Sequence, residues 1–101
     1  MPLTIDVTRA VDRVLVHLRG EADLAAVPLL LDRLWAAAAA GDPVDVHVAE
    51  VRFCDGTCLR VLGDFHADLD GAGRTCRLVD VPPRTRRLLQ LSGRSDLLAT
   101  T

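Results

Sequence analysis

The chain has 101 residues, a length typical of one domain. Half of its residues are hydrophobic, which excludes a disordered polar chain, and a net charge of −2 excludes the strongly basic surface with which many proteins capture nucleic acid. No apolar run approaches the ~20 residues that cross a bilayer, and the first residues lack a signal-peptide pattern. We therefore expect a single cytoplasmic domain over residues 1–101 that binds neither nucleic acid nor membrane.

The first half of the chain predicts two strands and a helix. Alternating apolar residues predict strands over 3–9 and 12–19, joined by a turn at residues 10 and 11. Gly-Glu-Ala-Asp at 20–23 interrupts the alternation and predicts a loop. A helix is expected from about Ala26 to Ala40, with Pro28 in its first turn and Gly41 just past its end. Its apolar stripe is expected to consist of Leu30, Leu31, Leu34 and Ala38, with Trp35 beside it.

The second half alternates strands with helices. Strands are predicted over 44–49 and 75–81, and helices over about 57–70 and from Pro83 until Gly93. The helix over 57–70 is expected to bury Cys58, Leu62, Phe65 and Leu69, and to expose Arg60, Asp64 and Asp68. The order ββαβαβα predicts an α/β fold, in which helices pack on a mixed sheet of four to five strands.

The stretch FCDGTCL, residues 53–59, lies where the third strand gives way to the second long helix. Cys54 and Cys58 could be metal ligands, but zinc sites usually show two closely spaced pairs, and no second pair occurs. A nucleophilic cysteine would need a base beside it, and the pattern nominates none of the histidines. A free cysteine on an apolar stripe behaves as a small hydrophobic side chain. We expect the cysteines to pack in the core, with no metal, no cofactor and no enzymatic activity. A metal or catalytic site is the alternative.

Thr57 supports two interpretations. As the first residue of the helix over 57–70 it could be an N-cap, whose hydroxyl stabilises a helix by about 1 kcal/mol. It could equally accept a phosphate, with a charge of about −1.5 to −2. The positive end of the helix dipole would tolerate this charge, while Asp55 nearby would add to the repulsion of an acidic partner.

Four stretches of the chain resemble the STAS domain family and, within it, the small bacterial anti-sigma-factor antagonists. The stretches are VLVHLRGEADL (14–24), VRFCDGTCLRVL (51–62), RLVDVPPRTRRLLQLSG (77–93) and RSDLL (94–98). Together they cover about residues 3–99 in the family's order, and each one alone is less specific than the set.

This resemblance implies a function. Such antagonists bind an anti-sigma factor that is also a serine/threonine kinase, and thereby free a sigma factor. The kinase phosphorylates a hydroxyl residue in an Asp-Ser-Ser-Gly stretch, which weakens binding, and a phosphatase reverses the modification. By the resemblance, Asp55 matches the aspartate of that stretch and Thr57 matches the phosphorylated serine. Asp23, with Glu21 beside it, matches a loop acid that contacts the partner.

We expect the partner-binding surface at one end of the sheet. Its predicted members are Glu21, Asp23, Asp55, Gly56, Arg60, Val61 and Asp64. Arg60 and Asp64 could also be an ordinary exposed pair on one helix face. Four residues depart from the family pattern. Gly56 replaces the first serine, Thr57 keeps the hydroxyl of the second serine but adds a methyl group, Cys58 replaces a glycine, and His47 replaces an aspartate common in the third strand. An alternative is a STAS subunit of a lipid-transport ATPase complex, or a STAS binding module without phosphorylation.

Overall fold

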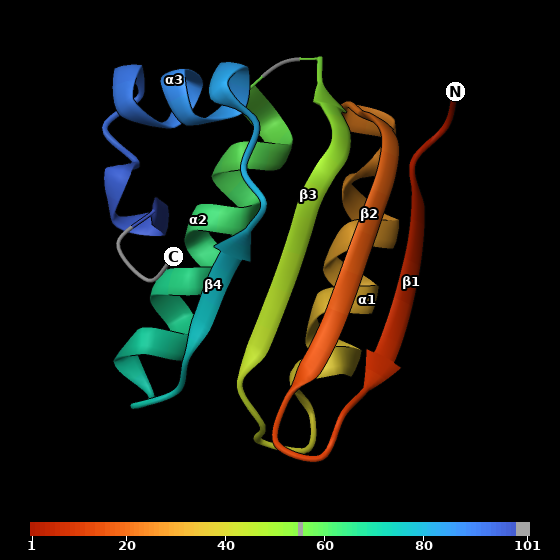
Figure 1. Ribbon diagram of the computed structural model, residues 1–101, viewed down its shortest axis with the longest axis vertical. Helices are drawn as coiled ribbons and strands as arrows, with labels where there is room; N and C mark the ends of the chain where they lie inside the picture. Colours follow the sequence, from red (N-terminus) through yellow and green to blue (C-terminus); the bar gives the residue numbers. More distant parts are fainter. Residues whose placement is uncertain (55, 99–101) are drawn as a thin grey trace.

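The computed structural model describes residues 1–54 and 56–98, in which four strands form one mixed sheet. The strands are β1 (Thr4–Arg9), β2 (Val14–Ala22), β3 (Val44–Phe53) and β4 (Cys76–Val79), and they lie in the sheet in chain order. β1 runs antiparallel to β2, whereas β2, β3 and β4 are parallel (Figure 1). The predicted α/β fold with a mixed sheet is confirmed.

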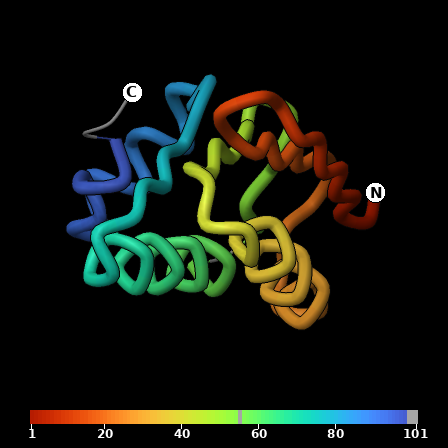
Figure 2. The backbone as a smooth tube through the Cα atoms, turned by 90° about the horizontal axis from the view of Figure 1, so that it is seen from below, coloured from red at the N-terminus to blue at the C-terminus, as the bar shows by residue number. Residues whose placement is uncertain are grey.

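The helices cover one side of this sheet and its β4 edge. They are α1 (Val27–Ala38), which follows the 3-10 turn η1 (Leu24–Ala26), α2 (Gly56–Gly71) and α3 (Pro83–Leu91), followed by the 3-10 turn η2 (Ser95–Leu98). α1 and α2 lie on the same side of the sheet, and α3 and η2 lie beyond β4 (Figures 1 and 2). None of the described helices is long and apolar enough to span a membrane.

The hydrophobic core lies between the sheet and these two long helices. From β2 it takes alternate residues, among them Val16 and Leu18, and the equivalent face of β3 supplies three valines. The stripe predicted for the second long helix is confirmed: Cys58, Leu62, Phe65 and Leu69 are all buried. Burying a leucine or phenylalanine side chain stabilises a fold by about 1.5–3 kcal/mol, so this stripe holds α2 firmly on the sheet.

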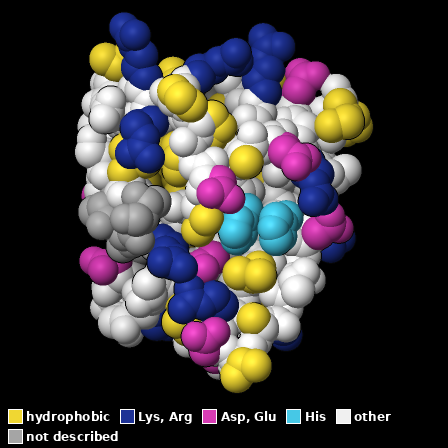
Figure 3. Space-filling view, viewed as in Figure 1, with side chains coloured by type: hydrophobic (Ala, Val, Ile, Leu, Met, Phe, Trp, Pro, Cys, Tyr) yellow, Lys and Arg dark blue, Asp and Glu magenta, His cyan; other side chains and the backbone are white. Residues whose placement is uncertain are grey.

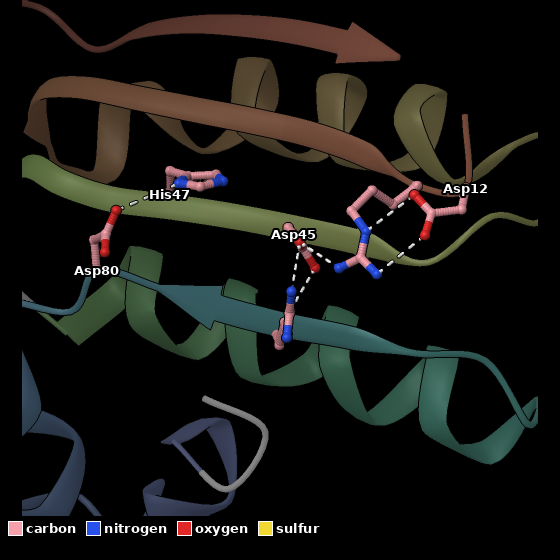
Figure 4. Close-up of polar contacts among 6 residues, drawn as sticks. Asp12, Asp45, His47 and Asp80 are labelled. Atoms are coloured by element: carbon pink, nitrogen blue, oxygen red, sulfur yellow. Dashed lines mark hydrogen bonds and ion pairs between the residues drawn. The ribbon is translucent and has the colours of Figure 1, made fainter. Parts of the chain in front are cut away.

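The opposite face of the sheet carries charged and polar side chains (Figure 3). Asp45 on β3 is only 3% exposed. Its carboxylate accepts two hydrogen bonds from Arg77, at 2.8 and 3.0 Å, and one from Arg13 at 2.9 Å (Figure 4). The hydrogen bonds from Arg77 are the main reason that the pKa of Asp45 lies below its usual value.

Two histidines lie beside this cluster on the same face. His17 on β2 and His47 on β3 are paired in register, and their rings stack with centroids 4.4 Å apart. Nδ1 of His47 lies 3.7 Å from the carboxylate of Asp80 (Figure 4). The position at which the family often has an aspartate is therefore part of a histidine stack in this chain.

Two strands are longer than predicted. β2 continues through residues 20–22, which were expected to form a loop, because these residues pair in parallel with residues 51–53 of β3. β3 likewise runs to Phe53 and not only to residue 49. Glu21 consequently lies on a strand, and the expectation that it belongs to a loop is wrong.

Other boundaries differ for local reasons. β4 is shorter than predicted because Asp80 has a φ of 57°, which ends the extended conformation. Leu31 is exposed, so its assignment to the buried stripe of α1 is wrong, and Ala37 takes a place there. The positive φ of Gly41 and Gly93 confirms both as residues that follow helix ends.

Candidate functional site

The predicted site lies where the two central parallel strands end. β2 ends at Ala22 and β3 at Phe53, and the backbone N–H of Cys54 donates to the carbonyl of Ala22 at 3.0 Å. Each strand then leads directly into a helical segment, η1 or α2, so both helical segments begin at this edge of the sheet (Figure 1). In open α/β sheets, ligands and partners commonly bind outside the carboxyl ends of the strands.

Thr57 lies in the first turn of α2 and is half-buried. Thr57 lies inside the helix, which already includes Gly56, so the interpretation of Thr57 as the N-cap is wrong. Asp55, which was predicted to bind the partner, lies outside the described residues. The first turn of a helix favours negative charge through its N–H groups and dipole, so a phosphate on Thr57 is compatible with the fold.

Cys58 connects α2 to the segment that follows β2. It is fully buried, and its thiol donates to the backbone carbonyl of Asp23 at 3.2 Å. The expectation that Cys58 is a core residue is confirmed. Because a glycine could not make this contact, the departure from the family pattern at this position ties Asp23 to the start of the helix that carries Thr57.

Cys54 has a different environment. Its thiol is exposed and lies 3.5 Å from the carboxylate of Glu21, so the expectation that it packs in the core is wrong. Glu21 also accepts a hydrogen bond from the amine of Met1 at 2.7 Å, which is the main cause of its lowered pKa. Desolvation and then the Glu21 carboxylate raise the pKa of Cys54, opposite to what a nucleophilic cysteine requires.

The side chains that could act as metal ligands do not form a cluster among the described residues. Across residues 1–54 and 56–98, no three side chains of the His, Cys, Asp and Glu types are placed to hold a metal ion. Cys76 is buried, and desolvation raises the pKa of its thiol to about 12, whereas a metal ligand must be a thiolate.

The remaining predicted contact residues are on α2. Gly56, Arg60 and Asp64 are exposed and Val61 is half-buried. Arg60 lines a hollow of about 370 Å³, whose other described lining residues are Phe53, Cys54, Gly56, Leu59, Leu88, Ser92 and Arg94. The contact of Cys58 with Asp23 places the first turn of α2, including Gly56, beside Asp23, whereas Asp64 lies in the middle of the helix.

Sequence reasoning missed Arg94. Its guanidinium lies over Gly63, where a Cβ atom would come within 2.7 Å of Nη1, and it reaches to 3.9 Å from Asp64. Asp64 thus pairs with Arg94, and not with Arg60 as the spacing suggested. A glycine in the middle of an otherwise regular helix was the available signal, because such a glycine often permits a close approach.

Comparisons with known proteins agree with this geometry. A family model described as "Mlab, STAS domain" matches residues 5–99. Among curated proteins nothing matches the chain. A solved anti-sigma factor antagonist from Mycobacterium paratuberculosis has 25% identity and a TM-score of 0.82, covering 94% of this chain and 81% of that one.

Two further structures are of SpoIIAA, each at 18% identity. The unphosphorylated form gives a TM-score of 0.76, with 93% of this chain and 84% of that chain covered. The phosphorylated form from Bacillus gives a TM-score of 0.72, with 93% of this chain and 87% of that chain covered. At this identity the likeness concerns the fold. Because the family model spans nearly the whole chain, the protein belongs to the STAS domain family.

Proposed function

We propose that the protein is an anti-sigma-factor antagonist without enzymatic activity of its own. It binds an anti-sigma factor that is also a serine/threonine kinase, phosphorylation of Thr57 weakens this binding, and a phosphatase restores it. The observation that carries the proposal is the position of Thr57 in the first turn of α2, at the end of the sheet where Asp23 is tied to the same helix. The similarity to the mycobacterial antagonist supports it.

The structure gives a physical reason for a switch that changes binding and leaves folding intact. The α2 dipole stabilises a phosphate on Thr57 within the free protein. A bound partner would bury this dianion next to Val61 and close to the Asp23 segment. Phosphate in an apolar interface or near an acidic side chain costs desolvation and repulsion, so phosphorylation weakens the complex.

The test combines kinase treatment with binding. Incubation with the anti-sigma kinase encoded nearest in the genome, together with ATP, should add about 80 Da, one phosphoryl group, and Thr57→Ala should abolish this gain. Thr57→Glu should weaken partner binding by roughly tenfold or more, about 1.4 kcal/mol, while Thr57→Ala keeps it. Thr8→Glu, an exposed threonine on β1, controls for added charge. Equal affinity of Thr57→Glu and Thr57→Ala would refute the switch.

A second candidate is a structural STAS subunit of a lipid-transport ATPase complex. It is favoured by Gly56 and Cys58, which replace the serine and glycine on either side of the matched phosphorylation site. In this case the partner would be a nucleotide-binding subunit. Affinity for it would be the same for the untreated and the kinase-treated protein, which separates the two candidates.

A further inference from the structure

α1 and α2 leave an exposed apolar seam on the side of the molecule away from the sheet. Both helices start at the same end of the sheet and are in contact (Figures 1 and 2). Along η1 and α1, Leu24, Leu31 and Trp35 are 68%, 37% and 42% exposed. Leu31 and Trp35 are one turn apart on one face of α1, and Leu24 lies on the turn η1 that precedes this helix.

A ring contact places Trp35 at the junction of the two helices. Trp35 meets the buried Phe65 of α2 edge to face, with ring centroids 4.9 Å apart. One turn earlier on the respective helices lie Leu31 and the half-buried Val61. We call the surface formed by Leu24, Leu31, Trp35 and Val61 the α1–α2 groove.

Acidic side chains border this groove. Asp32 on α1 and Asp64 on α2 have side chains 79% and 68% exposed, Asp68 is exposed one turn further along α2, and Asp23 lies at the end nearest Thr57. Two of these acids have a cation nearby: Arg33 is 3.9 Å from Asp32, and Arg94 is 3.9 Å from Asp64. Exposed ion pairs of this length contribute little, so the carboxylates remain available to a ligand.

We propose that the α1–α2 groove binds a basic amphipathic helix. The apolar side chains of such a helix would lie against Leu31 and Trp35, and its lysines or arginines would pair with the bordering aspartates. The inference rests on the proposed function for the source of the helix, which is a segment of the anti-sigma factor. The chemistry of the groove decides the kind of segment.

Three physical arguments select this occupant. Exposed apolar side chains one turn apart match the side chains that one face of a helix presents. A partly exposed tryptophan is a residue type that often dominates binding energy. Acidic borders attract a basic ligand and repel an acidic one. Thr57 lies one turn before Val61 on α2, so the end of a bound helix reaches the residue that the proposed function modifies.

Trp35 makes the test direct, because it is the only tryptophan in the chain. The intact protein is titrated with a tryptophan-free peptide of leucine and lysine in a helical pattern, about 18 residues or roughly five turns long. A second peptide carries glutamate in place of every lysine. The lysine peptide should shift the Trp35 emission saturably to shorter wavelength, and high salt should weaken its binding roughly tenfold. Equal binding of the glutamate peptide would overturn the proposal.

Matched variants locate the site. Leu31→Glu lies in the groove, whereas Leu29→Glu changes a residue of nearly equal exposure, 39% against 37%, outside it. Asp68→Arg lies on the border, and Asp70→Arg makes the same charge change on the same helix away from the border. Leu31→Glu and Asp68→Arg should lower the affinity for the lysine peptide roughly tenfold, about 1.4 kcal/mol. The two control variants should lower it less than twofold. Equal losses in variants and controls would overturn the assignment.

The same four variants are then measured against the anti-sigma factor. If it binds the wild type and all four variants alike, the groove is not its docking site, while the proposed function stands. If it binds no form of the protein, but the peptide results hold, the proposed function fails and the groove remains a site for basic helices.

Discussion

The two sides of the sheet differ in how their charged side chains are paired. On the open face, Arg77 and Arg13 pair with Asp45, and Arg19 bridges Asp6 and Glu50 at 2.8 and 3.1 Å. On the helical side, the exposed Asp68 of α2 has no ion pair among the described residues, and Leu31 and Trp35 of α1 are exposed. The open face therefore pairs its charged groups with one another, although Nε2 of His47 on this face is buried without a described hydrogen-bond partner, whereas the α1–α2 groove retains exposed apolar area and carboxylates that a ligand could contact.

This difference predicts that charged residues on the open face contribute to stability, and that residues of the groove contribute to binding. A buried charge that loses its partner is costly to the fold, but an exposed carboxylate that gains one improves association. Substitutions on the open face should consequently change unfolding and leave affinity intact, and those in the groove should do the reverse. Three predictions test this separation.

The largest effect is expected at the Asp45 cluster. Asp45→Ala removes the buried partner of Arg77 and Arg13, whose side chains are 36% and 32% exposed, and should lower the free energy of unfolding by about 1.5–3 kcal/mol. Urea unfolding measures this change. Asp12→Ala is the control, since Asp12 is an exposed neighbour of Arg13 at 3.3 Å and should change stability by less than about 1 kcal/mol. A tenfold loss of affinity for the lysine peptide in folded Asp45→Ala would contradict the separation.

Acid should destabilise the protein through the same cluster. Because Arg77 holds the pKa of Asp45 below its usual value, the unfolded chain binds a proton at a higher pH than the folded one. The stabilisation is complete above the unfolded pKa of about 4 and is lost as the pH falls through the lower folded pKa. The free energy of unfolding should be lower at pH 3 than at pH 6, and this decrease should be smaller in Asp45→Asn than in the wild type. An unchanged decrease in that variant would assign acid sensitivity to other carboxylates.

The smallest effect is expected at Gly63. A Cβ in Gly63→Ala would displace the end of the Arg94 side chain, while alanine favours the helix by about 1 kcal/mol. The two contributions oppose each other, so the free energy of unfolding should change by less than about 1 kcal/mol. Moving Arg94 away from Asp64 should roughly double the affinity for the lysine peptide. A weaker affinity would show that Arg94 does not compete for Asp64. Gly71→Ala, where a Cβ meets nothing, is the control.

Local periodicity was enough to predict the fold class and the buried stripe of α2. It failed where pairing between distant segments decides the structure. Residues 20–22 look like a loop in isolation, and β3 makes them a strand by supplying hydrogen-bond partners. Leu31 fits an apolar stripe equally well whether it is buried or exposed, because the pattern does not contain the neighbouring helix that decides its burial.

The candidate site was predicted less completely than the fold. The family resemblance led to the residues around Thr57, and the structure places Gly56, Thr57 and Cys58 in the first turn of α2, beside Asp23. The contact of Cys58 with Asp23, the exposed position of Cys54 and the approach of Arg94 depend on side-chain directions that spacing does not encode. The α1–α2 groove was missed for the same reason: Leu31, one of its members, was expected to be buried.

The order of the strands has a consequence for how the chain folds during synthesis. Each of the four described strands pairs only with strands adjacent to it in the chain, so none of them has to insert between two others that have already paired. The sheet can therefore grow from one edge as each new strand leaves the ribosome. Each step closes a loop no longer than the connection between two consecutive strands. Such local growth favours fast folding and limits the time for which unpaired strand edges are exposed to aggregation.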